Sequence, residues 1–410
     1  MAKLLRSLQD SEIIARFQRR CGLFPAPDES PGAEKSPAAD GQDSTGRAAS
    51  LQVTGGPGIF HLPAWPGKLL EIPSNSLRRR DLEKSFEQKY IVKNYFFYYL
   101  FKFSAALGQE VFYITFLPFT YWNIDCYSAK RLIIIWVLVM YIGQVAKDLL
   151  KWPRPFSPPV VKLEKRVITE YGMPSTHAMA ATAISFTLLI STMDRFQYPF
   201  ILGLMLAVVF STLVCLSRIY TGMHTVLDVL GGIFITTILI ILTYPSWPLL
   251  DSLDSASPLF PVCVLVVPFV LCYNYPVPEL YSPTRADTTT IMAAGAGATI
   301  GFWMNHFFQL SSEPASSMPM IKSLSTLTTH QMFLGLSRFT VGIVLILGVR
   351  QLMQKLSLQV LFSWFKVVTR NKEARRRLEI EVPYKFVTYT SVGLCTTTFV
   401  PMLHRFLGLL

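Results

Sequence analysis

Long apolar runs constrain this chain more than any other feature of its sequence. Nine stretches approach the length of about 20 residues with which an α-helix crosses a bilayer, and hydrophobic residues fill 51% of the 410 positions. The stretches are Tyr95–Tyr121, Leu132–Val145, His177–Met193, Tyr198–Leu216, Val226–Thr243, Leu259–Cys272, Thr289–Phe308, Met332–Val349 and Phe386–Leu403. Any one could be a buried helix of a soluble core, but nine in one chain make that interpretation hard to hold. The sequence therefore predicts an all-α, polytopic membrane protein of about nine transmembrane helices.

The first of these stretches is long enough to be broken at Gly108, and the sixth is short. We expect a catalytic transmembrane core over residues 91–245, with a helical bundle that carries the site. Residues 246–410 are expected to add transmembrane helices and a basic loop at 350–385.

Residues 1–90 are expected to be mostly disordered, because the stretch from Pro25 to about Pro66 is rich in Pro, Gly, Ser, Ala and Asp and cannot bury a core. The segment Leu8–Arg20 is amphipathic. It is either a helix that suits an anionic membrane surface or a weakly helical exposed segment, and its short length favours the second interpretation. No cleaved signal peptide is indicated.

The formal net charge is +12, and charged residues make up 16% of the chain. A nucleic-acid partner would need a soluble basic face, which the sequence does not show, so we expect none. Anionic lipid headgroups or anionic substrates are the expected partners. The six cysteines are scattered, mostly inside apolar runs, and show neither metal spacing nor a disulfide framework.

Three polar clusters stand at the edges of apolar stretches between Lys147 and Asp228. They are Lys147-Asp-Leu-Leu-Lys-Trp-Pro-Arg154-Pro155, Pro174-Ser175-Thr176-His177, and Ser217-Arg218-Ile-Tyr-Thr-Gly-Met-His224-Thr-Val-Leu-Asp228. Prolines between the first two clusters predict an extended loop, and Ser175 is expected to be the N-cap of the next helix. Counting spans brings all three clusters to one side of the membrane.

The cations of Lys147, Arg154 and Arg218 would converge at one helix mouth. Three unpaired cations beside hydrocarbon are costly without an anion, and a phosphoryl group matches them. The amides of Thr176 and His177, at a helix N-terminus, would add donors. Basic residues that merely flank spans are the common alternative for a single Lys or Arg. The combination with two histidines favours a phosphate site.

His224 and Asp228 are four positions apart, so the carboxylate can hold a proton on one ring nitrogen and leave the other as a nucleophile. His177, on another helix, is the expected acid and then base. An interhelical polar pair that only packs is the alternative. We expect no metal, because a divalent ion would be repelled by the three cations from which a phosphate gains.

These clusters resemble the signature of the type 2 phosphatidic acid phosphatase superfamily: Lys-x6-Arg-Pro, Pro-Ser-Gly-His and Ser-Arg-x5-His-x3-Asp. One departure is Thr176, where the broad pattern has Gly. By this resemblance His224 is the nucleophile, His177 the acid and Asp228 the orienting group, with no cofactor. The resemblance implies that the phosphate holders are Lys147, Arg154, Ser175 and Arg218, and the helix N-terminus adds the amide of Thr176.

The sequence around these clusters is similar to the sphingosine-1-phosphate phosphatase branch of that superfamily. Four stretches carry this likeness: Ser157–Glu164, Tyr171–Met179, Leu216–His224 and Glu381–Lys385. The resemblance implies a multi-pass enzyme of the endoplasmic reticulum that dephosphorylates sphingosine 1-phosphate and its dihydro form. A phosphatase of other lipids, such as phosphatidate or polyprenyl pyrophosphate, and a non-catalytic lipid-phosphate transporter or scaffold are the alternatives.

Overall fold

The computed structural model describes residues 7–26, 90–164, 170–193, 195–252, 257–276, 282–308, 322–323, 329–366 and 374–409. Helices dominate these residues, as predicted. Six helical segments are long and apolar enough to cross a membrane, and Phe260–Tyr273 is a shorter apolar helix. Every one of the nine apolar stretches contains a helix, whereas nine complete crossings are not established. The expected disordered stretch from about Pro25 to Pro66 lies almost entirely outside the described residues.

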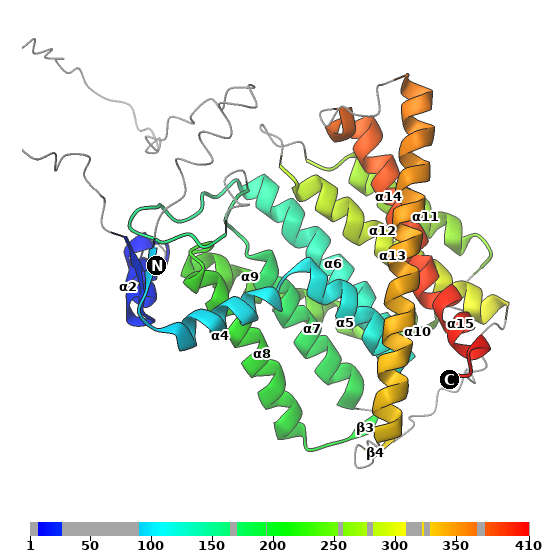
Figure 1. Ribbon diagram of the computed structural model, residues 1–410, viewed down its shortest axis with the longest axis horizontal. Helices are drawn as coiled ribbons and strands as arrows, with labels where there is room; N and C mark the ends of the chain where they lie inside the picture. The colour runs from blue at the N-terminus through cyan, green and yellow to red at the C-terminus, as the bar shows by residue number, and fades with distance from the viewer. Residues whose placement is uncertain are drawn as a thin grey trace, which may run out of the picture. The chain divides into compact units, whose positions relative to one another are not determined.

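Four helices form the bundle that carries the polar clusters: α6 (Cys126–Leu150), α7 (Thr176–Met193), α8 (Phe200–Tyr220) and α9 (Val226–Thr243). Helix α7 packs against the other three (Figure 1). Its buried face is lined by small side chains, including Ala178, Ala180, Ala181 and Ala183, which let neighbouring helices approach closely. The C-terminal ends of α6 and α8 and the N-terminal ends of α7 and α9 therefore meet.

The first apolar stretch forms two helices, α4 (Tyr95–Ala106) and α5 (Glu110–Asn123), so the predicted break at Gly108 is confirmed. A Cβ at Gly108 would lie 3.1 Å from the His177 ring, so a bulkier residue would press on that imidazole. The break thus brings the chain close to the site.

The C-terminal part consists of α11 (Phe260–Tyr273), α12 (Thr284–Phe307), α13 (Thr329–Phe365) and α14 (Leu378–Leu394), followed by a π-helical turn (Cys395–Phe399) and α15 (Val400–Phe406). Helices α12 and α14 touch through glycines. A Cβ at Gly297 would stand 2.0 Å from the Thr390 carbonyl oxygen, and one at Gly393 would stand 2.1 Å from the Ala294 carbonyl oxygen. This close packing requires the absence of a side chain.

The expected basic loop at 350–385 is wrong over most of its length. Helix α13 continues without interruption to Phe365, and α14 begins at Leu378. The physical reason is local: no Pro or Gly interrupts the chain between Gly348 and Phe365, and apolar residues recur throughout. Long basic side chains are tolerated there because they can extend toward water.

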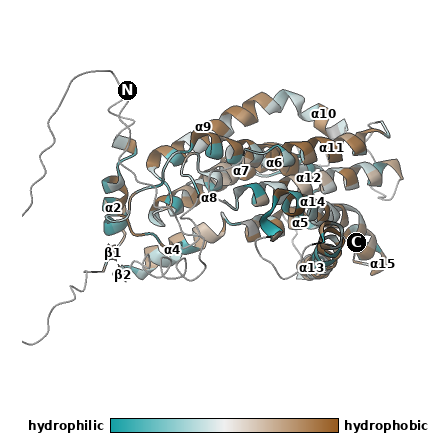
Figure 2. Cartoon of the chain, turned by 90° about the horizontal axis from the view of Figure 1, so that it is seen from above, coloured by the Kyte–Doolittle hydropathy of each residue, from teal (hydrophilic) through white to brown (hydrophobic). Residues whose placement is uncertain are grey.

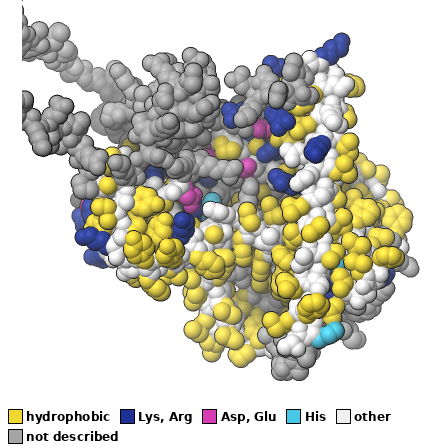
Figure 3. All heavy atoms as spheres, viewed as in Figure 1, with side chains coloured by type: hydrophobic (Ala, Val, Ile, Leu, Met, Phe, Trp, Pro, Cys, Tyr) yellow, Lys and Arg dark blue, Asp and Glu magenta, His cyan; other side chains and the backbone are white. Residues whose placement is uncertain are grey.

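Apolar side chains cover much of the outer surface of these helices (Figures 2 and 3). Phe234 on α9 is 66% exposed and Phe333 on α13 is 71% exposed. Exposed apolar residues on this scale are unfavourable in water and favourable against lipid chains. The protein is thus a multi-pass membrane protein.

The N-terminal segment forms a docked helix, α2 (Ser11–Arg20), so the interpretation of an exposed, weakly helical segment is wrong. Ile14 and Ala15 are buried among Val160, Cys215 and Ile219. The helix is stabilised by this tertiary packing, which short helices need and which sequence periodicity alone does not reveal.

The remaining elements are short. They are η2 (Tyr244–Ser246), α10 (Trp247–Asp251), η4 (Ala374–Arg376) and the strands β1 (Leu23–Pro25), β2 (Tyr90–Val92), β3 (Phe196–Gln197) and β4 (Lys322–Ser323). Strand β3 pairs with β4 in parallel.

Candidate active site

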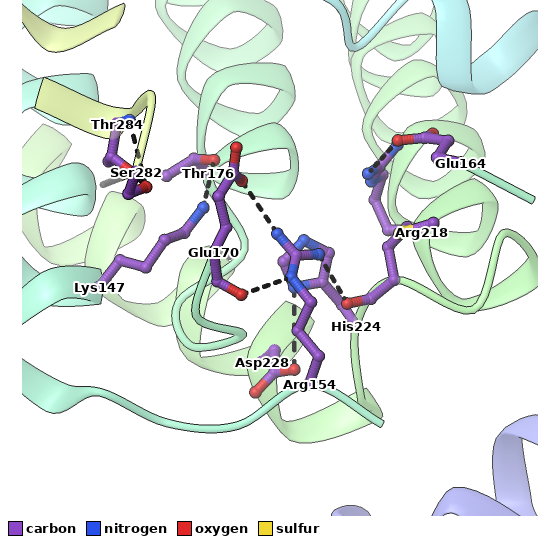
Figure 4. Close-up of polar contacts among 11 residues, drawn as sticks. Lys147, Arg154, Glu164, Glu170, Thr176, Arg218, His224, Asp228, Ser282 and Thr284 are labelled. Carbon is purple, nitrogen blue, oxygen red and sulfur yellow. Dashed lines mark hydrogen bonds and ion pairs between the residues drawn. The ribbon is translucent and has the colours of Figure 1, made fainter. Parts of the chain in front are cut away.

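Backbone hydrogen bonds join the three polar clusters at one end of the bundle. The Ser175 amide donates to the Asp228 carbonyl oxygen at 3.0 Å, and the Gly172 amide donates to that of Trp152 at 2.6 Å. The guanidinium of Arg154 donates to the Met223 carbonyl oxygen at 2.9 Å. The clusters, far apart in sequence, therefore lie side by side. We call the following eight residues the cup: Lys147, Arg154, Ser175, Thr176, His177, Arg218, His224 and Asp228. Figure 4 shows six of them: Lys147, Arg154, Thr176, Arg218, His224 and Asp228.

Helix ends place these side chains. Lys147 lies in the last turn of α6 and Arg218 in the last turn of α8, where cations oppose the negative end of the helix dipole. Thr176 begins α7, and its hydroxyl accepts a hydrogen bond from the Lys147 ammonium at 3.3 Å. The Thr that replaces the superfamily Gly thus helps to orient one of the cations.

The expectation of three unpaired cations is wrong for the two arginines. Arg154 is ion-paired with Glu170 at 3.0 Å, and Arg218 is held by both oxygens of Glu164 at 2.7 and 3.2 Å. Two buried guanidinium groups require carboxylates as counter-charges when no other anion is bound. Neither carboxylate was identified from the sequence. The signal was available, since Glu164 and Glu170 are acidic residues in a loop that connects two cationic clusters.

His224 precedes α9, and Asp228 lies in the first turn of that helix. Asp228 accepts a hydrogen bond from the Thr225 amide at 2.7 Å in a capping box. The same carboxylate oxygen lies 3.8 Å from Nδ1 of His224. This exceeds a hydrogen bond but leaves the pair facing each other, with Nε2 as the other ring nitrogen.

Five buried polar atoms of the cup have no hydrogen-bond partner among the described residues. They are Ser175 Oγ, His177 Nδ1, Arg218 Nε, His224 Nδ1 and Asp228 Oδ1. The Ser175 hydroxyl therefore makes no N-cap hydrogen bond there, in contrast to its expected role. Buried polar atoms without partners are costly, and their concentration in one place indicates that a polar ligand or water completes the site.

The electrostatics of the cup favour a neutral imidazole at His224. Burial, and then the positive charges of Arg154, Arg218 and Lys147, lower the pKa of His224 well below 6.5. Burial also lowers the pKa of Arg154 to about 10, opposed by the charge of Glu170, so Arg154 remains cationic at neutral pH. A neutral imidazole beside a cationic arginine can attack an electrophile that carries negative charge.

No group of three His, Cys, Asp or Glu side chains within the described part of the chain is arranged to hold a metal ion. The absence of a metal from the reaction stays a prediction, which rests on the cationic surroundings of the two histidines.

Comparison with known proteins agrees with this geometry. Residues 128–250, which include the whole cup, match the PAP2 superfamily. The chain is 76% identical to sphingosine-1-phosphate phosphatase 2 of Homo sapiens over 100% of both chains. It is 37% identical to sphingosine-1-phosphate phosphatase 1 of Mus musculus, over 100% of this chain and 98% of that one.

A more distant relative is a dihydrosphingosine 1-phosphate phosphatase of Schizosaccharomyces pombe, which is 30% identical over 50% of this chain and 51% of that one. No solved structure matches the chain. Full-length likeness to sphingosine-1-phosphate phosphatases 1 and 2, together with a PAP2 region that carries two imidazoles among three cations, shows that the chain belongs to the sphingosine-1-phosphate phosphatase family.

Proposed function

We propose that this protein hydrolyses sphingosine 1-phosphate and dihydrosphingosine 1-phosphate to the free sphingoid base and phosphate. The observation that carries the proposal is the cup itself, where partnerless buried donors and acceptors surround two imidazoles and three cations. The names of the relatives support the choice of lipid. The helix-mouth position lets a lipid chain stay in the bilayer while its headgroup enters.

In the proposed reaction, Nε2 of His224 attacks phosphorus and the bond from phosphorus to the lipid oxygen breaks. The negative charge of the bound phosphate favours the protonated form of His177, which gives its proton to that oxygen, so the sphingoid base leaves as an alcohol. His177 then accepts a proton from water as the water oxygen attacks phosphorus. The nitrogen–phosphorus bond breaks, which releases phosphate and restores His224.

The other cup residues hold charge and geometry in this proposal. Asp228 faces Nδ1 of His224, which keeps a proton there and leaves the Nε2 lone pair outward. Lys147, Arg154 and Arg218 bind the phosphoryl oxygens, and Ser175 with the Thr176 amide adds donors at the start of α7. Arg154 and Arg218 exchange their glutamate partners for phosphate in this step.

Phosphate release from purified protein in detergent, with a chelator present, tests the function. We expect wild type to be active and sensitive to vanadate, and His224→Ala to lose at least about a thousandfold in kcat. His330→Ala is the matched control, since His330 is exposed on α13 and should keep full activity. Undiminished turnover by His224→Ala would reject the nucleophile.

Two rival functions have their own readouts. Competition among sphingosine 1-phosphate, phosphatidate and a polyprenyl pyrophosphate in one assay separates a sphingoid enzyme from a broader lipid phosphatase. Trapping of labelled phosphate on His224 excludes a transporter or scaffold, because binding alone forms no phosphohistidine. We also infer residence in the endoplasmic reticulum membrane, which cell fractionation tests.

A further inference from the structure

Two glutamates form the outer layer of the cup, in front of the arginines. The side chains of Glu164 and Glu170 are 27% and 22% exposed, whereas those of Arg218 and Arg154 are 2% and 7% exposed. The carboxylates are therefore nearer to solvent than the guanidinium groups with which they pair.

The two carboxylates differ in how fully they are engaged. Glu164 uses both oxygens on the fork of Arg218. Glu170 uses one oxygen, Oε2, on Arg154, and its other oxygen makes no hydrogen bond with the described residues. A backbone bond from Arg154 Nε to the Glu170 carbonyl oxygen, at 2.9 Å, keeps the residue next to Arg154 even without the carboxylate contact. The Glu170 side chain can thus move while its backbone stays in place.

Glu170 is also the more central of the two. Its charge acts on both Lys147 and Arg154, ahead of every other charged group that acts on them. In Figure 4 it lies between these two cations, while Glu164 lies beyond Arg218. A phosphoryl group held by Lys147 and Arg154 would therefore have the Glu170 carboxylate beside it.

The balance of charges around the cup indicates which further charged group the substrate should carry. Four cations, Lys147, Arg154, Lys162 and Arg218, are balanced by four carboxylates, Asp148, Glu164, Glu170 and Asp228. A phosphate monoester dianion therefore enters a site with no net positive charge. A carboxylate that remains beside the phosphate repels it. A positive group on the substrate, close to its phosphate, removes this conflict by pairing with the carboxylate.

Under the proposed function, on which this inference rests, the substrate carries such a group. The 2-ammonium of a sphingoid base phosphate is only four bonds from phosphorus, so it stays at the mouth while the phosphate is held. We propose that Glu170 is a specificity-determining residue, whose carboxylate exchanges Arg154 for this ammonium when the phosphate binds. Phosphatidate and polyprenyl pyrophosphate lack the amine and leave the carboxylate uncompensated.

Paired substrates test this role. One is sphingosine 1-phosphate, and the other is the same long-chain 3-hydroxy phosphate with hydrogen in place of the 2-amino group. We expect wild type to prefer the amine by about tenfold in kcat/KM, which corresponds to about 1.4 kcal/mol. In Glu170→Gln the preference should fall to near unity, mainly through a higher KM for the amine, while the deamino substrate keeps its KM or binds more tightly.

Glu164→Gln is the matched control, and it should change kcat/KM for both substrates by the same factor. A pH series adds a second readout, because the wild-type preference should vanish as the amine loses its proton above about pH 9, whereas Glu170→Gln should show no such change. Lys147, Arg154 and Lys162 act on both substrates alike, so their own titration cancels in the ratio.

An equal change of both substrates in Glu170→Gln would overturn the inference, because a glutamate that only holds or competes for Arg154 does not distinguish them. If Glu170→Gln does not accumulate, Glu170→Asp carries the test: its shorter reach should reduce the preference, and an unchanged ratio counts against the inference. Failure of the proposed function looks different, since wild type would then hydrolyse neither substrate.

Discussion

Replacement of Gln18 tests whether the N-terminal helix α2 supports the cup. The Gln18 side chain is 1% exposed. Its amide nitrogen donates to the carbonyl oxygens of Val161, at 2.7 Å, and Tyr220, at 2.8 Å, and its oxygen accepts from the Val161 amide at 2.9 Å. Gln18 thus ties α2 to the loop that leads to Glu164 and to the end of α8, which carries Arg218.

Gln18→Ala removes all three of these hydrogen bonds. The buried amide and carbonyl of Val161 lose their bonds to Gln18, at a cost of about 1–3 kcal/mol each, so docking of α2 should weaken by at least about 2 kcal/mol, or roughly thirtyfold in its equilibrium. A loosened loop displaces the phosphate-binding side chains, and small displacements of this kind are costly to catalysis. We expect kcat/KM to fall by about tenfold or more.

Hydrogen exchange of the Ser11–Arg20 amides in detergent, together with kcat/KM, measures both effects. Gln18→Met should behave like Gln18→Ala, because it keeps the volume and removes the hydrogen bonds. Arg16→Ala is the control on the same helix, since the Arg16 side chain is 69% exposed and, among the residues that the structure describes, makes only a surface ion pair with Glu12. If both Gln18 variants matched Arg16→Ala in exchange and activity, the reasoning would be refuted.

Three further outcomes follow from the site. Asp228→Asn should keep the capping hydrogen bond of α9. Its kcat should nevertheless fall by about 10²–10⁴-fold, because the group that faces His224 Nδ1 is no longer charged. An unchanged kcat would show that Asp228 does not orient His224. Gly222→Ala should lower the free energy of unfolding by about 1–3 kcal/mol, and with it the melting temperature. Gly222 has φ +71°, and a Cβ there would lie 2.3 Å from the Val161 carbonyl oxygen. An unaltered melting curve would contradict this. His224 has a lowered pKa, so it is neutral in the folded protein, while the unfolded chain binds a proton below about pH 6.5. His224 should therefore contribute a decrease in the free energy of unfolding from pH 7 to pH 5, and this contribution should be missing in His224→Gln. Equal slopes for wild type and His224→Gln would show that His224 contributes nothing.

The cup could be anticipated from the sequence because its residues stand beside features that act locally. Apolar run length determines which segments are helices, and prolines between Pro153 and Pro159 end one helix before Ser175 and Thr176 begin the next. Clusters at successive helix ends then meet, whatever the details of packing. The same local reasoning was wrong for α13, where it placed a loop on the strength of basic charge although nothing in the sequence interrupts the helix.

The sequence by itself determined that the chain spans a membrane and that histidines and cations gather at one end of a helical bundle, since hydropathy and helix-end signals act within a few residues. Only the tertiary structure decided the partners: Glu164 with Arg218 across 54 positions, and Gln18 with Val161 and Tyr220 across 143 and 202. By composition alone, any carboxylate in the loop could pair with either arginine. Which glutamate pairs with which arginine depends on the path of the loop and on the docking of α2. Both are determined by contacts between distant segments, which must all form together.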